Sequence, residues 1–151
     1  MPASVRVQLG AALGERSGTP LDAAARRLIE RAARAALRHE RARSAEISIT
    51  LLDDAEIAAM NAEFLSHGGP TDVISFPLYE DGEDPVGDIY IGYDQAVRQA
   101  AAHDVAASEE LARLAVHGVL HVLGYDHPDG GDRLDSDMWR VQEAIVARVI
   151  A

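Results

Sequence analysis

The segment His117-Gly118-Val119-Leu120-His121-Val122-Leu123-Gly124-Tyr125-Asp126-His127 decides the architecture that we expect for this chain. It continues a run whose apolar residues recur at helical spacing, which predicts a helix from about Ser108 to Leu123. Ser108 is placed to cap this helix, and the two residues that follow it are acidic and suit the positive N-terminal end. Residues four apart lie on one face of a helix, so His117 and His121 can present two imidazoles to a single point.

Gly124 is placed to end this helix in the left-handed conformation that residues with a Cβ atom resist. The resulting turn would bring His127 toward the other two rings as a third nitrogen ligand. Three neutral imidazoles suit one zinc ion and leave one tetrahedral position open, and an open position is typical of catalytic rather than structural zinc. The sequence therefore predicts one zinc ion per chain, bound by His117, His121 and His127 and used for hydrolysis.

The spacing H-x-x-x-H-x-x-G-x-x-H is that of the metzincin metalloproteases, with one difference. Gly118 stands where those proteases have the glutamate that acts as general base. Without that carboxylate, peptide hydrolysis loses its usual proton acceptor, whereas a metal can assist phosphodiester cleavage without a strong protein base. The pattern thus favours phosphoryl chemistry. The histidines at 39, 67 and 103 have no partner at ligand spacing and are better explained as surface or loop residues.

Outward from this segment, alternating and helical patterns follow one another along the chain. Strands are expected around residues 5–9, 47–51, 72–78 and 86–91, the last two as an antiparallel pair. Helices are expected at about 21–39, 53–64 (with Asp53 as N-cap), 94–103, 108–123 and 135–150. This order predicts an α+β fold, in which about five helices pack on a small mixed sheet of about four strands and one helix is the metzincin-like zinc helix.

Composition sets outer limits on function. The 151 residues contain no Cys, so a transition-metal site must use His, Asp or Glu, and the length suits one domain spanning residues 1–151. No apolar run reaches the roughly 18 to 20 residues of a membrane span, and no leader pattern is present, so we expect a soluble cytoplasmic protein that contacts no membrane.

The charge is uneven along the chain. The net charge of -11 argues against a protein that wraps nucleic acid. Residues 1–43, however, hold nine Arg against four acidic residues, whereas residues 44–151 hold five Arg against twenty-one. This N-terminal excess has two interpretations: a solvated helix face that balances charge, or a contact with RNA or the ribosome.

Two motifs together identify a resemblance. HGVLHVLGYDH at 117–127 resembles the signature HGxLHLxGYDH of the YbeY family, and PTDVISF at 70–76 resembles its second signature, PTDVLSF. Further matches are Asn61 with Phe64, Gly87-Asp88-Ile89 and Met138, so the likeness covers about residues 50 to 145. It implies a metal-dependent, single-strand-specific endoribonuclease of the bacterial cytoplasm that acts in 16S rRNA 3′-end maturation, small-subunit assembly and ribosome quality control.

The resemblance also implies partners and site residues. The partners would be rRNA and the small ribosomal subunit, with ribosomal proteins or an assembly GTPase as further candidates and no DNA. The family's zinc ligands fall on His117, His121 and His127. One departure concerns phosphate binding: many family members have an Arg where this chain has Leu65. Arg98, Arg113 or the N-terminal arginines are candidates to replace it.

Two carboxylates are candidate catalytic residues, each with a structural alternative. Asp72 either caps a turn or lines the cleft and holds a histidine; Asp126 either caps the turn after the zinc helix or orients an imidazole and moves protons. Trp139 is interpreted as part of the packing face of the last helix. Two rival functions remain beside the RNA hydrolase: a non-catalytic, zinc-stabilised ribosome-assembly factor, and a peptide or small-molecule zinc hydrolase, which an acid-lined cleft would favour.

Overall fold

The computed structural model describes residues 4–11, 22–65, 71–125 and 137–151. Four strands and five helices follow in the order β1 (Ser4–Ala11), α1 (Ala23–His39), β2 (Ser44–Leu52), α2 (Asp54–Leu65), β3 (Val73–Pro77), β4 (Val86–Gly92), α3 (Tyr93–Ala102), α4 (Ala107–Val122) and α5 (Asp137–Ile150). The predicted α+β class and the mixed sheet are confirmed. None of the described helices is both long and apolar enough to cross a membrane.

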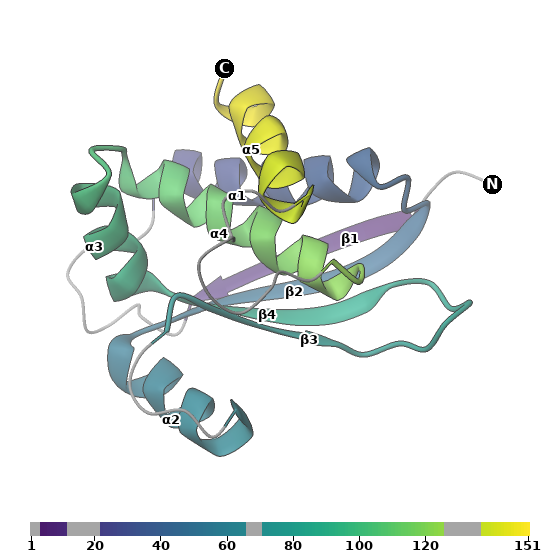
Figure 1. Ribbon diagram of the computed structural model, residues 1–151, viewed down its shortest axis with the longest axis horizontal. Coiled ribbons are helices and arrows are strands. Elements are labelled where there is room, and N and C mark those ends of the chain that lie inside the picture. The colour runs from purple at the N-terminus through teal and green to yellow at the C-terminus, as the bar shows by residue number, and fades with distance from the viewer. Residues whose placement is uncertain (1–3, 12–21, 66–70, 126–136) are drawn as a thin grey trace.

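The sheet has the strand order β1-β2-β4-β3. β1 pairs with β2, and β2 with β4, in parallel, whereas β3 runs antiparallel to β4 as the short turn between them predicts. Figure 1 shows α1, α3, α4 and α5 on one side of the sheet and α2 at one end of the other side. The main hydrophobic core therefore lies between the sheet and α1, α4 and α5.

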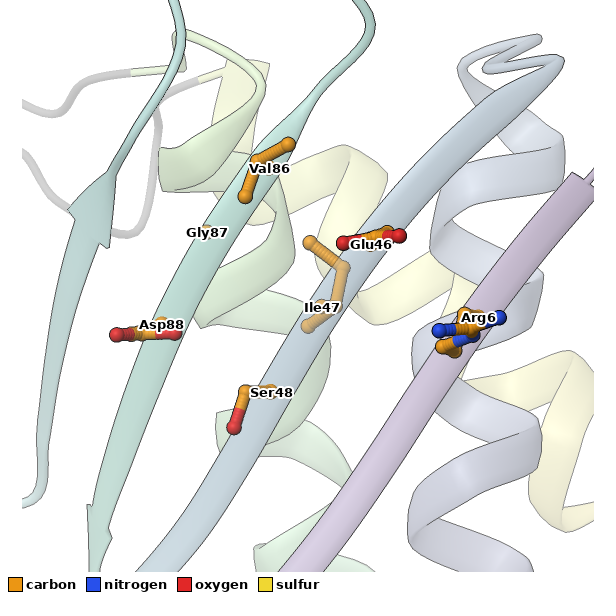
Figure 2. A pocket seen from close by; sticks show the side chains of 7 residues that line it. All are labelled: Arg6, Glu46, Ile47, Ser48, Val86, Gly87 and Asp88. Atoms are coloured by element: carbon orange, nitrogen blue, oxygen red, sulfur yellow. The ribbon is translucent and has the colours of Figure 1, made fainter.

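The other face of the sheet is polar where α2 does not cover it. Figure 2 shows Arg6 of β1, Glu46 and Ser48 of β2, and Asp88 of β4 on neighbouring strands around a cavity of about 110 Å³. The alternation along β2 explains this pattern, because Ala45, Ile47 and Ile49 are buried while the residues between them are not. The sheet thus has one face in the core, and that face supports α4.

Of the two N-caps that the sequence predicts, Asp53 is confirmed and Ser108 is not, and α1 has a cap that was not predicted. Asp22 caps α1 by accepting from Ala25 N at 2.7 Å. The Asp53 carboxylate accepts from Glu56 N at 2.8 Å while Asp53 N donates to the Glu56 carboxylate at 3.2 Å, which is a capping box. The prediction that Ser108 caps α4 is wrong, because the helix begins one residue earlier. Its N-cap is Ala106, which has no capping side chain.

Candidate metal centre

The first two predicted ligands, His117 and His121, lie on α4, most of which is buried. Eleven of its residues are buried, including His117 and Gly118. An ideal Cβ atom at Gly118 would lie only 2.7 Å from Cγ2 of Ile89 on β4. Position 118 therefore faces the sheet at very close range, and no glutamate would fit there. The difference from the metalloprotease pattern has a packing cause, since α4 can approach β4 this closely only with glycine at this point.

The end of α4 has the geometry that the sequence predicts. Gly124 has a φ of +103°, Tyr125 N donates to Leu120 O at 2.9 Å, and Gly124 N donates to His121 O at 3.0 Å. These two bonds form a Schellman motif, in which glycine is the preferred residue at the left-handed position. The prediction for Gly124 is confirmed.

Two tyrosines fix the chain on either side of this turn. The Tyr79 hydroxyl donates to Val122 O, a carbonyl of the last helical turn, at 2.6 Å. The Tyr125 hydroxyl donates to Glu40 at the end of α1 at 3.1 Å. Burial, followed by the neighbouring Glu40 carboxylate, raises the pKa of Tyr125, so its hydroxyl stays a proton donor. The position from which the chain leaves α4 is thus well determined.

The imidazoles of His117 and His121 lie together, with ring centroids 4.6 Å apart and planes at 78°. Nδ1 of His121 lies 3.0 Å from Tyr125 O, and Nδ1 of His117 lies 2.7 Å from Oε1 of Gln142 on α5. Each acceptor is a carbonyl oxygen, which has no proton to give, so Nδ1 must be the protonated nitrogen of each neutral ring.

Gln142 is itself held in one orientation. Its Nε2 donates to Glu143 at 3.0 Å, which turns its oxygen toward His117. A proton on Nδ1 leaves the lone pair of each ring on Nε2. A metal-binding histidine takes this form when a second residue fixes its tautomer. The donor set of His117 and His121 therefore fits a transition metal. The sequence patterns gave no signal for Gln142, which lies 25 residues from its partner and on another helix.

A cavity of about 490 Å³ lies beside His117, between α3, α4 and α5. Its charged walls are Asp72, Glu110, Arg113 and Glu143, and its other lining residues include Gln99, His103, Leu114 and Trp139. Asp72 accepts from Gln99 Nε2 at 3.3 Å. The structure thus places Asp72 at the cleft rather than only in a turn. Trp139 is half-buried on the last helix and also lines the cavity, whereas Met138, Ile145 and Val146 are core residues as predicted.

Arg113 organises the acidic side of this cavity. Its guanidinium donates to Glu109 at 3.0 Å, to Glu110 at 3.0 Å and to Glu143 at 2.9 Å. Burial acts to lower the pKa of Arg113, but the bonds to these carboxylates together outweigh it and raise the pKa. Burial raises the pKa of Glu110, and the bond from Arg113 opposes that shift. One cation among four acidic residues leaves the cavity region with a negative balance, and a chain of contacts runs from Arg113 through Glu143 and Gln142 to His117.

The structure describes some of the remaining predicted residues and not others. His127 and Asp126 lie outside the described residues, as does His67. Among the described residues, no group of three or more His, Asp or Glu side chains is close enough to hold a metal. The structure therefore brings together two of the three predicted ligands. His39 is exposed and contacts Glu40, and His103 is exposed at the cavity.

The chain is similar to the members of one protein family and to a solved structure. The chain matches the family described as Endoribonuclease YbeY over residues 15–150. It is 44% identical to the Endoribonuclease YbeY of Geobacillus kaustophilus over 115 residues, which are 69% of this chain and 72% of that protein. It is 45% identical to that of Moorella thermoacetica over 116 residues, 70% and 73% of the two chains. The solution structure of TM1509 from Thermotoga maritima covers 96% of this chain and 88% of its own, with a TM-score of 0.60 at 26% identity.

Proposed function

The chain belongs to the YbeY family of endoribonucleases, and from this premise we propose that it is a zinc-dependent endoribonuclease specific for single-stranded RNA. We place it in 16S rRNA 3′-end maturation, small-subunit assembly and ribosome quality control in the bacterial cytoplasm. Its partners are then rRNA and the small ribosomal subunit, with ribosomal proteins or an assembly GTPase as further candidates. The family match supports the endoribonuclease class, and the zinc site rests on the histidines.

The observation that carries the proposal is the state of the two imidazoles. His117 and His121 share one face of α4, and carbonyl oxygens hold the proton of each ring on Nδ1. His117, His121 and His127 would hold the metal. When bound, zinc supplies a Lewis acid that polarises phosphoryl oxygens and makes water more acidic.

The chain's own residues have three tasks in this proposal. Gln142 and the Tyr125 carbonyl orient the ligand rings and fix their tautomers. Asp72, at the cavity that His117 also lines, accepts or passes a proton, and Asp126 is the second candidate for this task. Position 118 takes no part, since it faces Ile89 and not the cleft. The general base of a metalloprotease is thus replaced by carboxylates on other elements.

A comparison of the wild type with His117→Ala on single-stranded RNA tests the proposal, with His39→Ala as the matched control because His39 is an exposed histidine of α1. Both variants and the wild type are purified free of trace nucleases. We expect His117→Ala to lose at least about 100-fold in cleavage rate and His39→Ala to retain the wild-type rate. Equal cleavage by all three would remove the enzymatic proposal.

The acidic cavity favours a second candidate. Asp72, Glu110 and Glu143 outnumber Arg113 around it, and an acidic site would attract a neutral or cationic substrate rather than phosphate. The alternative is a zinc hydrolase of peptides or small amines. Hydrolysis of a peptide library that depends on His117, with no RNA cleavage by the same preparation, would establish this alternative instead.

A further inference from the structure

The exposed cations of this acidic chain are concentrated on α1 and the turn that follows it. Arg27, Arg31 and Arg38 are exposed on the helix, and Arg41 and Arg43 are exposed just beyond it. Steps of four and seven residues place the three helical arginines along one side of α1. We call Arg27, Arg31, Arg38, Arg41 and Arg43 the α1 arginine stripe. Figure 1 shows that α1 runs along the far side of α4.

Three arginines on other helices, by contrast, pair with carboxylates. Arg98 pairs with Asp54, Arg113 with three glutamates, and Arg140 with Asp137. In the described part of the chain, no ion pair involves Arg27, Arg38, Arg41 or Arg43. Arg31 donates a long bond, 3.4 Å, to Val149 O. The charge of the stripe is therefore not balanced by paired carboxylates. Arg98 and Arg113, the candidates to replace the Arg that many family members have at the position of Leu65, are each paired with carboxylates.

Arg41 occupies a backbone position that normally selects glycine. Its φ is +59°, Arg41 N donates to Arg38 O at 3.0 Å, and Ala42 N donates to Leu37 O at 2.9 Å, so it holds the left-handed position of a Schellman motif. A side chain with a Cβ atom is unfavourable there. Arg41 thus adds a cation to the end of the stripe at a cost to stability.

We propose that the α1 arginine stripe binds the phosphate backbone of RNA and so holds the substrate against a molecule that is acidic elsewhere. This inference rests on the proposed function in taking RNA as the substrate. Phosphates need cationic surface, and the cavity beside His117 has a negative balance. A membrane surface is the less fitting occupant, because interfacial helices also present large apolar residues. None of the exposed large hydrophobic residues found in the described chain, which are Phe64, Leu78, Val97 and Ile150, lies on α1.

Binding is tested with the zinc-loaded full chain and a fluorescent 2′-O-methyl uridine oligonucleotide of about 30 nucleotides, whose 2′-oxygen cannot attack the phosphate and whose integrity is checked by gel electrophoresis after each titration. Anisotropy gives Kd at roughly 50 to 200 mM salt. We expect Arg27→Gln/Arg38→Gln to weaken binding about tenfold or more and to reduce the slope of log K against log salt by about 1.4, or about 0.7 per lost phosphate contact. Arg98→Gln/Arg140→Gln changes the net charge equally and should keep Kd within about twofold.

Arg41→Gly separates binding from folding. We expect it to raise the melting temperature by about 2 °C, because glycine tolerates the left-handed position, while weakening RNA binding about threefold. A variant that is more stable and yet binds RNA less tightly cannot have lost affinity through misfolding.

Several results would contradict the proposal that the α1 arginine stripe binds RNA. One is an equal loss of RNA affinity in Arg27→Gln/Arg38→Gln and Arg98→Gln/Arg140→Gln, and another is an unchanged salt slope in Arg27→Gln/Arg38→Gln. A third is that Arg27→Gln/Arg38→Gln loses binding to phosphatidylserine vesicles but binds RNA normally, which would make α1 a lipid contact. A different result would show that the proposed function is wrong. RNA cleavage would then be independent of His117, whether or not the stripe variants lose affinity.

Discussion

At the scale of single residues, the candidate centre depends on a glutamine as much as on its histidines. Gln142 is 2% exposed and holds the Nδ1 proton of His117 at 2.7 Å. We expect Gln142→Leu, similar in size, to weaken zinc binding about 10- to 100-fold, because it removes the acceptor that fixes the tautomer and leaves a buried N–H without a partner. Competition with a chelating dye at neutral pH measures the zinc affinity.

Gln142→Glu is the control for that experiment, because it keeps an acceptor at the same place. Its zinc affinity should stay within a few-fold of the wild-type value. Wild-type affinity in Gln142→Leu would show that the 2.7 Å bond does not prepare His117 for a metal.

Glu110 gives a pH dependence of known sign. Burial raises its pKa above the ordinary 4.5, so the folded chain binds this proton more tightly than the unfolded chain does. The ionised carboxylate therefore costs stability at neutral pH, and the cost disappears as the pH falls through the folded pKa and below 4.5. We expect Glu110→Gln to be the more stable protein at neutral pH and to lose that advantage in acid.

Urea unfolding at about pH 7.5 and pH 4 measures both proteins, and the difference between them cancels the other titrating groups. Arg113 keeps its bonds to Glu109 and Glu143 in the variant. A variant that is less stable than the wild type at neutral pH would mean that the Glu110–Arg113 pair outweighs the burial of the carboxylate.

At the scale of elements, the contact between α4 and β4 depends on the missing side chain of Gly118. A Cβ atom there would lie 2.7 Å from Ile89, which is fully buried. We expect Gly118→Ala to lower the free energy of unfolding by about 1 to 3 kcal/mol through overpacking. Combined with Ile89→Ala, which alone costs about 2 to 5 kcal/mol, it should cost clearly less than the sum. Strictly additive losses by urea denaturation would contradict the close contact.

The elements themselves could be predicted from local patterns. The helix bounds agree with the sequence to within two residues, because apolar periodicity, Asp22, Asp53 and Gly124 act over only a few residues. The parts that could not be predicted depend on distant contacts. Ser108 has the right chemistry for a cap, but α4 starts before it. The contact between Gln142 and His117 and the acidic cavity form only when α5 packs against α4, and no local pattern encodes that packing.

At the scale of the whole molecule, charge is divided between two regions. Carboxylates surround Arg113 beside the candidate metal centre, whereas no carboxylate ion pair is found at the described arginines of the α1 arginine stripe. The net charge of -11 conceals this division, although the counts before and after residue 43 indicate it. A substrate that carries phosphates would be attracted to α1 and would reach the acidic cleft only with a metal present to offset the negative charge.

Metal binding should also stabilise the whole molecule. The ligands His117 and His121 lie on α4, their orienting groups come from α5 and from the turn after Gly124, and that turn is tied to α1 through Glu40. Unfolding any of these elements destroys the site, so binding energy adds to global stability. At zinc concentrations about 100 times Kd, we expect a gain of about 2.7 kcal/mol and a rise of about 5 to 10 °C in melting temperature.

Scanning calorimetry of the wild type, His121→Ala and His39→Ala, each with and without zinc, measures this linkage. His39→Ala should show the full rise and His121→Ala nearly none, because the His121 ring lies 4.6 Å from that of His117, whereas His39 is exposed at the end of α1. Magnesium should leave all three unchanged, since it prefers oxygen ligands to imidazole. A rise that persists in His121→Ala would place the zinc elsewhere, and the pairing of the two rings on α4 would then serve packing alone.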